Sequence, residues 1–381
     1  MIECHQFGRP DALTVRRWQG PRSSDFLGSI LKAPLRLLYT LNSHFRTEPR
    51  GGTEIMKRLL IGICFVLAIV TSASLIPARA RDAVGPVPQA AENGAPANPP
   101  RFRFHWYPVG QGPLGMAFDG ANIWTANYGE GSVTKLRASD GKKLGTFELG
   151  GVPTGVTFDG ANIWESDSGG DTVTELQASD GKKLRTFNLG PAPAFMAFDG
   201  ANIWVTTTPT TGKGTVHKIR ASDGKNLGNF PVGVGAIAVG FDGHNIWVTN
   251  GGEFSVTKLR ASDGKFLGTF QVGGAPIGIT FDGANMWIAN RGYGTVTKLR
   301  ASNGKLLGTF SVPGAPYGLA FDGSHIWVTG DSAVTELRAT DGKTLHYYNV
   351  SGPQTTGIVF TGTNIWVTGW NNNAAGKLAN F

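Results

Sequence analysis

The stretch FDGANIW occupies residues 118–124 and recurs unchanged at residues 158–164 and 198–204. Four looser copies follow, which are FDGHNIW from Phe241, FDGANMW from Phe281, FDGSHIW from Phe321 and FTGTNIW from Phe360. Successive copies begin 39 to 43 residues apart. A period of this length is typical of a repeat architecture, so the fold has to be derived from one repeat unit.

One repeat divides into four short runs at its turn-forming residues. The copy PIGITFDGANMWIANRGYGTVTKLRASNGKLLGTFSV, from Pro276, gives the runs 277–281, 285–290, 295–301 and 305–312. Each run has the length and the aromatic or β-branched content of a strand. Asp-Gly or Asn-Gly pairs, which tolerate the positive φ angles of tight hairpins, separate the first run from the second and the third from the fourth. The unit is therefore predicted to be a four-stranded antiparallel meander.

Seven such sheets can bury their apolar faces only against one another. We therefore predict an all-β fold, a seven-bladed β-propeller over residues 102–381. The seventh copy has runs at 357–360, 364–368 and 376–381 and no fourth run, so residues 102–109 are expected to complete that blade. The repeated Trp is expected to pack between blades. Its seven copies are Trp124, Trp164, Trp204, Trp247, Trp287, Trp327 and Trp366.

The residues before the repeats have a different character. Residues 56–80, MKRLLIGICFVLAIVTSASLIPARA, have a basic start, an apolar run and an Ala-x-Ala end, as in a secretory signal peptide cleaved near Ala80. Two alternatives remain for residues 1–55: an upstream extension that is not native or is disordered, with Met56 as the initiator, or a cytoplasmic extension before a signal anchor. Residues 81–101 are rich in Pro and Ala and are predicted to be a flexible linker.

Charge and cysteine content restrict the partners and the compartment. The net charge of +8 is concentrated at the N-terminus, because residues 81–381 contain 24 of the 35 Lys and Arg and 22 of the 27 Asp and Glu. Nucleic acid is therefore a poor candidate partner. Both cysteines, Cys4 and Cys64, precede the predicted cleavage site. We expect a periplasmic or secreted monomer with no disulfide and no membrane span in the mature chain.

The phrases NIWVTN, SVTKLRASDGK and LGTF resemble those of the bacterial YVTN-type and streptogramin-lyase-like (virginiamycin B lyase-like) β-propellers. This resemblance implies the same fold, and for the lyases it implies a His and Glu constellation with magnesium at the mouth of the central channel. The histidines of the repeats do not match that pattern, so no catalytic residue is carried over and the catalytic residues stay unknown. These histidines are His105, His217, His244, His325 and His346.

The seven copies differ mainly at one end of the blades. The turns made by FDG and by ASDGK hardly vary, whereas the connections from second to third strand and from fourth to first strand diverge, as in NYGEGS and GWNNNAAG. A ligand is expected at this variable end; neutral drift of exposed loops is the alternative. The predicted ligand-binding residues are Tyr128, Glu165, Asp167, Glu253, Arg291, Tyr293, Tyr317 and Trp370, with Asp171 and Asp331 as further polar candidates.

Two functions follow from this pattern. The first is a binding or interaction scaffold for a protein, glycan or small molecule, with no cofactor. The alternative is a lyase of the streptogramin-lyase kind, in which Glu165 and Asp167 hold Mg or Ca. A solvated acidic loop is the simpler explanation of these two carboxylates. The basic third-strand pattern VTKLRA is interrupted by Glu175 and Glu336, and we expect ion pairs between blades, from residues such as Asp119, to neutralise it.

Overall fold

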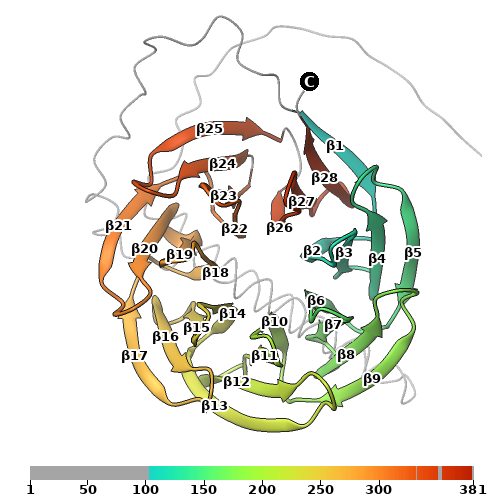
Figure 1. Ribbon diagram of the computed structural model, residues 1–381, viewed down its shortest axis with the longest axis horizontal. Helices are drawn as coiled ribbons and strands as arrows, with labels where there is room; N and C mark the ends of the chain where they lie inside the picture. Colours follow the sequence, from blue (N-terminus) through green and yellow to red (C-terminus); the bar gives the residue numbers. More distant parts are fainter. Residues whose placement is uncertain (1–102, 332, 351–353, 380–381) are drawn as a thin grey trace, which may run out of the picture. The chain divides into compact units, whose positions relative to one another are not determined.

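Seven four-stranded antiparallel sheets form a ring in the computed structural model, which describes residues 103–331, 333–350 and 354–379 (Figure 1). The predicted seven-bladed β-propeller is therefore confirmed. The predicted extension, signal peptide and linker lie outside the described residues. No helix within the described ranges is long and apolar enough to cross a membrane.

The blades follow one another in chain order. Blades 1 to 3 contain β2 (Pro113–Phe118), β3 (Asn122–Asn127), β4 (Ser132–Arg137) and β5 (Lys143–Glu148); β6 (Pro153–Phe158), β7 (Asn162–Asp167), β8 (Thr172–Gln177) and β9 (Lys183–Asn188); β10 (Pro193–Phe198), β11 (Asn202–Thr207), β12 (Lys213–Arg220) and β13 (Asn226–Val234). Blades 4 to 6 contain β14 (Ala236–Phe241), β15 (Asn245–Asn250), β16 (Ser255–Arg260) and β17 (Phe266–Gln271); β18 (Pro276–Phe281), β19 (Asn285–Asn290), β20 (Thr295–Arg300) and β21 (Leu306–Ser311), with the 3₁₀ turn η2 (Arg291–Tyr293) between β19 and β20; β22 (Leu319–Phe321), β23 (His325–Thr329), β24 (Ala333–Arg338) and β25 (Thr344–Asn349).

Blade 7 joins the two ends of the repeat region. It contains β26 (Thr355–Phe360), β27 (Ile365–Gly369) and β28 (Ala374–Ala379), and β1 (Arg103–Pro108) is its outer strand. Strand β1 pairs antiparallel with β28, from Arg103 opposite Ala379 to Pro108 opposite Ala374. The predicted closure of the ring by the N-terminal strand is therefore confirmed.

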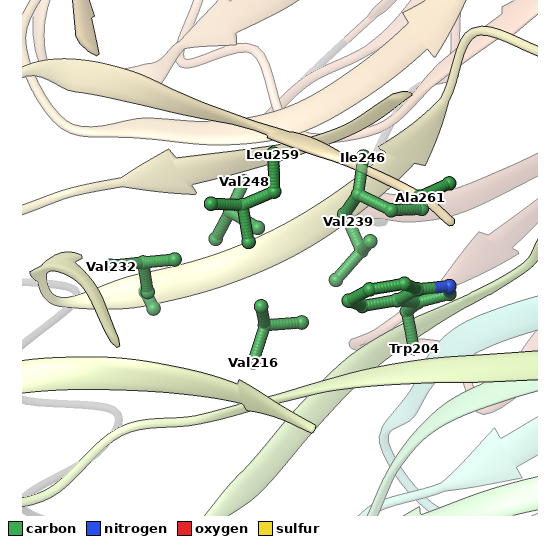
Figure 2. Packing of buried hydrophobic residues seen from close by; sticks show 9 residues of the cluster. Trp204, Val216, Val232, Val239, Ile246, Val248, Leu259 and Ala261 are labelled. Carbon is green, nitrogen blue, oxygen red and sulfur yellow. The ribbon is translucent and has the colours of Figure 1, made fainter. Parts of the chain in front are cut away.

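Trp packing fills the space between adjacent blades, as predicted. Six of the seven repeated Trp side chains are fully buried, and Trp327 is 7% exposed. At the seam between blades 3 and 4, Trp204 and Val216 pack against Ile246 and Leu259 of the next blade (Figure 2). Burial of a ring of this size removes roughly 150 to 250 Å² from water, so the seven seams supply most of the apolar core.

The Asp of FDG explains why the phrase is repeated. In each of blades 1 to 6, its carboxylate accepts a hydrogen bond from Nε1 of the Trp five residues later, at 2.7 to 2.8 Å. In blade 1, Asp119 also accepts from the backbone N–H groups of Ala121 and Asn122. Blade 7 has Thr361 at this position, and the buried Nε1 of Trp366 has no hydrogen-bond partner.

Restoring the Asp in blade 7 tests the role of this bond. We expect Thr361→Asp to give Trp366 Nε1 an acceptor and to raise the free energy of unfolding by about 1 kcal/mol, because a buried unpaired donor is removed. The measurement is the urea unfolding midpoint. The control is Thr363→Asp, which adds the same charge at an exposed position of the same turn. Equal midpoints for the two variants would contradict the explanation.

The third-strand lysines connect adjacent blades in a way that differs from our expectation. Each Lys Nζ donates to a backbone carbonyl of the ASDGK turn in the next blade, and not to an Asp; Lys135, for example, donates to Ala178 O and Ser179 O. The first of these two bonds is 2.6 to 3.2 Å long at the five seams that have the Lys. The exposed Asp of the turn pairs instead with the Arg three residues earlier, as Asp140 does with Arg137. The predicted ion pairs between blades are therefore wrong.

Blade 2 forms the same connection with a different residue pair. Glu175 replaces the Lys, and Arg185, opposite it in β9, replaces the Gly that stands there in four of the five Lys-bearing blades; in the fifth, blade 7, His105 lies opposite Lys377. Arg185 Nε lies 2.5 Å from Glu175 Oε2, and its Nη2 donates to Ala221 O of blade 3. The guanidinium thus performs the role of the missing ammonium while neutralising the buried carboxylate.

This substitution predicts coupling between residues 175 and 185. We expect Arg185→Gly alone to lower the free energy of unfolding by about 1 to 3 kcal/mol, because it leaves the buried Glu175 carboxylate without its cationic partner and with only the hydrogen bond from Asn162 Nδ2. The double change Glu175→Lys and Arg185→Gly recreates the pair of the other blades and is expected to recover most of that loss. A double-mutant cycle by urea unfolding measures the coupling. Additive effects of the two changes would sink this account.

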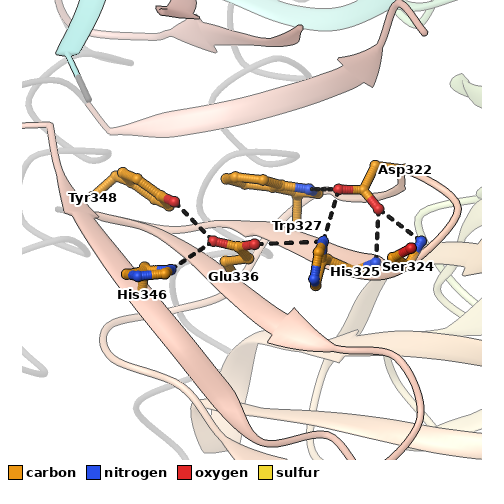
Figure 3. A network of polar contacts seen from close by, with 7 residues as sticks. All are labelled: Asp322, Ser324, His325, Trp327, Glu336, His346 and Tyr348. Atoms are coloured by element: carbon orange, nitrogen blue, oxygen red, sulfur yellow. Dashed lines mark hydrogen bonds and ion pairs between the residues drawn. The ribbon is translucent and has the colours of Figure 1, made fainter. Parts of the chain in front are cut away.

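Blade 6 departs from the pattern around Glu336 (Figure 3). The Glu336 carboxylate accepts hydrogen bonds from His346 Nδ1 at 2.9 Å and from Tyr348 OH at 2.7 Å. Burial, together with the Glu336 carboxylate, raises the pKa of Tyr348. His325 Nδ1 lies 3.1 Å from Asp322 and 3.5 Å from Glu336, so one chain of polar contacts joins the inner turn to the outer strand.

Candidate functional site

The two ends of the blades are chemically different. The FDG and ASDGK turns lie at the same end of the blade. In blade 1, for example, Ala138 N, at the start of ASDGK, donates to the carbonyl oxygen of Ala121, which follows FDG. At the axis, the inner strands of all seven blades line a central cavity of about 390 Å³. The lining at the variable end includes Leu114, Phe195 and Tyr317. This end of the cavity is the channel mouth.

Aromatic and aliphatic side chains from six blades meet at the channel mouth. Tyr128 and Trp370 are half-buried, and their ring centroids lie 5.3 Å apart with a 51° tilt. Both pack against the buried residues Leu114, Ile277 and Tyr317 in one apolar cluster. This mouth cluster is Leu114, Tyr128, Phe195, Ile237, Ile277, Tyr317 and Trp370. Three of the predicted ligand-binding residues are therefore brought together.

Arg291 adds a cation to this apolar surface. It is the first residue of η2, and its guanidinium carbon lies 5.4 Å from the centre of the Tyr317 ring. The side chain is 14% exposed, and its buried Nη1 has no hydrogen-bond partner. The nearest described carboxylate is that of Asp331, whose Oδ1 is 3.9 Å from Nη2. That separation exceeds hydrogen-bond length.

The two tyrosines of the mouth cluster are held in the neutral form. Burial raises the pKa of Tyr317 to about 12, although the nearby Arg291 charge acts in the opposite direction. Burial also raises the pKa of Tyr128. At neutral pH both hydroxyls are therefore protonated, and the charged group beside the mouth cluster is Arg291.

Glu165 does not lie at the mouth, contrary to expectation. It is in the interior of β7 with no exposed surface, and neither carboxylate oxygen has a hydrogen-bond partner. Its register partners are Val156 and Thr174. The corresponding positions of the other blades are all buried and uncharged, namely Thr125, Val205, Val248, Ile288, Val328 and Val367. Burial, and next the Asp167 carboxylate, raise the pKa of Glu165 well above its ordinary value.

The other acidic candidates serve local structure or remain exposed. Asp167 Oδ1 accepts from the backbone N–H groups of Val152, Gly169 and Gly170, which shapes the connections around it. Asp171 likewise accepts from a backbone N–H, that of Ala192. Glu253 is exposed.

Tyr293 and Asp331 lie at the edge of the variable end. Tyr293 is 47% exposed and contacts Phe254 at 6.1 Å between ring centroids, outside the mouth cluster. Asp331 is exposed and accepts a hydrogen bond from Gln354. The structure thus places both outside the mouth cluster, although Asp331 is adjacent to Arg291.

Glu165 and Asp167 do not fit the divalent-metal hypothesis. One Asp167 oxygen already accepts three backbone N–H groups, and Glu165 is enclosed between blades. Among the described residues, no group of three or more His, Cys, Asp or Glu is arranged to hold a metal ion. Mg²⁺ and Ca²⁺ need about six or more oxygen ligands, and Glu165 has no exposed surface at which water could supply the ligands beyond these two carboxylates.

Sequence reasoning missed the aliphatic part of the mouth cluster. Leu114, Ile237 and Ile277 occupy the second position of the inner strand, where the other copies have Thr, Ala or Tyr. Phe195 stands one residue later, where most copies have Gly. The signal was this variation inside an otherwise repeated strand, which a comparison confined to the loops does not detect.

The buried carboxyl of Glu165 predicts a pH-dependent stability. Because its pKa is higher in the folded than in the unfolded protein, the folded state keeps a proton that the unfolded state releases above about pH 4.3. The free energy of unfolding therefore falls as pH rises through the window between these two pKa values. We expect Glu165→Val to stabilise the protein by about 1 to 3 kcal/mol at pH 8 and by less at pH 5.

Urea unfolding at the two pH values measures this difference. The control is Glu148→Val, which removes an exposed carboxylate at the end of β5 and should show no such pH-dependent gain. A Glu165→Val protein that is less stable than the parent at pH 8 would contradict the prediction.

Comparison with known proteins shows the fold and not the activity. No family model and no curated protein sequence matches the chain. A catalytically inactive virginiamycin B lyase from Staphylococcus aureus, solved with quinupristin, superposes with a TM-score of 0.64 at 18% identity, over 74% of this chain and 100% of that one. A streptogramin B lyase gives 0.63 at 18% identity, over 74% and 98%. Hydrazine synthase from Kuenenia stuttgartiensis gives 0.61 at 16% identity, over 73% and 97%. In fold, the chain is a streptogramin-lyase-like seven-bladed β-propeller.

Proposed function

We propose that the protein is a binding propeller whose ligand contacts the mouth cluster and Arg291. One observation supports this most strongly: aromatic residues distant in sequence converge beside a guanidinium that has a buried, unpaired nitrogen. Aromatic side chains and Arg are the residue types that contribute most to recognition. An apolar surface with one oriented polar group is typical of a small-molecule site.

The opposite end of the blades offers fewer free groups. There the repeated carboxylates accept from Trp Nε1 and backbone N–H groups, and the repeated lysines donate to carbonyls of the next blade. These groups maintain the ring and are not available for a ligand. The mouth is the place where the copies differ and where a guanidinium with an unpaired nitrogen lies beside an aromatic ring, so we assign the ligand to it.

The lyase alternative has less support. The likeness to streptogramin B lyases is at 18% identity, which carries fold and not chemistry. The carboxylates hypothesised to hold a metal do not converge at the mouth. Binding without turnover is therefore the function we propose.

We also propose that the protein acts outside the cytoplasm, as a periplasmic or secreted protein. This proposal rests on the signal-peptide pattern of residues 56–80 and on the position of both cysteines before residue 81. The nearly balanced charge of residues 81–381 favours a ligand other than nucleic acid.

A ligand screen tests the mouth as the binding site. Purified full-length protein is screened against a chemically diverse small-molecule library by thermal shift, and each hit is repeated with Trp370→Ala. We expect the hits to lose their shift in this variant, because Trp370 forms half of the aromatic pair. The control is Tyr293→Ala, which removes an exposed aromatic ring outside the mouth cluster. Hits that persist in Trp370→Ala would refute the proposed site.

A further inference from the structure

We infer that the ligand of the mouth is a small organic monoanion with a flat apolar ring, and that Arg291 binds its carboxylate. This inference rests on the proposed function and adds the chemical class of the ligand. It follows from the unpaired guanidinium nitrogen, from the residues around it, and from the hydroxyl groups that are already engaged.

Arg291 lacks the partner that a buried guanidinium normally has. Its Nη1 is buried without an acceptor, and the Asp331 carboxylate stays 3.9 Å from Nη2 on a side chain that is itself 47% exposed. A buried donor without a partner is unfavourable, because it has lost its hydrogen bonds to water without replacement. A ligand oxygen that reaches this nitrogen removes that cost, so an acceptor is favoured here over an apolar group.

The charge pattern favours a single negative charge on the ligand. Among the described residues, the seven second-to-third-strand connections contain no Lys or Arg besides Arg291. Lys213, the first residue of β12, is exposed and outside the mouth cluster. Asp331 lies beside Arg291 and repels a second negative charge. The planar fork of a guanidinium matches a carboxylate with two parallel hydrogen bonds. A monocarboxylate fits both conditions.

The rest of the site favours a flat apolar ring over a sugar. Tyr128 and Trp370 offer aromatic faces, and Leu114 and Ile277 are apolar neighbours within the same cluster. The threonine hydroxyls of the inner strands are already hydrogen-bonded: Thr154 to Val152 O and Ser168, and Thr356 to Pro113 O and Thr368. Sugar hydroxyls would therefore find few partners, whereas an aromatic ring needs none.

Access to Nη1 requires a movement of the mouth side chains, because that nitrogen is covered. Tyr128 and Trp370 are only half-buried and stand on the variable connections of blades 1 and 7. We expect these side chains, which share a cluster with the Tyr317 ring that Arg291 contacts, to move when a ligand enters, without separation of two blades. Ligand binding should consequently change the environment of Trp370.

The test compares matched acids and amides. Benzoate, 2-naphthoate and indole-3-carboxylate, their three primary amides, and acetate are titrated into the full-length protein by calorimetry. We expect at least one aromatic acid to bind, its amide to bind roughly 10- to 100-fold more weakly, and acetate not to bind, because a hydrogen bond to a charged group and ring contact are both needed. Arg291→Gln should weaken binding of the acid to the level of the amide, and Arg291→Lys should recover only part of the loss.

Arg300→Gln is the matched control, since it removes an exposed Arg at the other end of the same blade and should change nothing. Thermal unfolding of each variant checks that the fold is retained. Equal affinity of acid and amide, unchanged binding in Arg291→Gln, or no binding of any of the three acids overturns the inference. If the screen finds only neutral ligands whose binding is lost in Trp370→Ala, the assignment of an anion is wrong and the proposed binding function stands. If no ligand loses binding in Trp370→Ala, the proposed function is wrong as well.

Discussion

The hydrogen bond from the repeated Trp to the Asp of FDG determines how one blade meets the next. The Asp carboxylate also accepts backbone N–H groups of its own turn, so it fixes the turn and the indole together. These bonds lower the pKa of Asp119 even though burial alone would raise it, and the carboxylate is therefore charged at neutral pH. An oriented indole presents one face to the adjacent blade, and the apolar residues of that blade complete the seam. The lysine above the ring, 5.0 Å from the Trp124 ring centre in blade 1, then reaches the next turn.

The channel mouth differs from the rest of the ring in the polar groups it offers. The hydrogen bonds within and between blades already engage most polar groups of the repeat. Carboxylates, lysines and several second-strand hydroxyls are bound within or between blades; Thr249 and Thr329, for example, donate to carbonyls of the next inner strand. What remains for recognition is the set of side chains that depart from the repeat. Arg291 and Trp370 depart in this way, and the structure brings Arg291 to Tyr317 and Trp370 to the cluster that contains Tyr317. A regular scaffold therefore makes its irregular positions informative about function.

The sequence was sufficient to predict the blades and their closure, because the signals are local. They are the Asp-Gly and Asn-Gly pairs, the runs of strand length, and the lack of a fourth run in the seventh copy. Strands of blade 5 begin and end within one residue of the predicted runs. The contacts between blades were not predictable in detail. The acceptors of each Lys are backbone carbonyls of another blade, and the sequence of the strand that carries the Lys does not reveal them. Glu165 was misplaced because its charge was given more weight than its position, although that position is apolar or Thr in the other copies. The mouth cluster draws on six blades, and only the folded ring shows which of its candidates meet.

Closure of the ring also accounts for the departure of blade 6 from the pattern. In blade 7 the third and fourth strands are β28 and β1, which come from opposite ends of the repeat region, so no ASDGK turn joins them. A Lys in blade 6 would have no turn carbonyls to bind at this seam, and an ammonium left there without acceptors would be unfavourable. Glu336 stands in its place and is satisfied from its own blade by His346 and Tyr348. Tyr348 replaces the Phe that stacks on the Trp in the preceding blade, and it keeps that contact with Trp327 at 5.4 Å between ring centroids while adding the hydroxyl that Glu336 needs. The pairing of β1 with β28 that closes the propeller thus also explains the polar network around Glu336 in the adjacent blade.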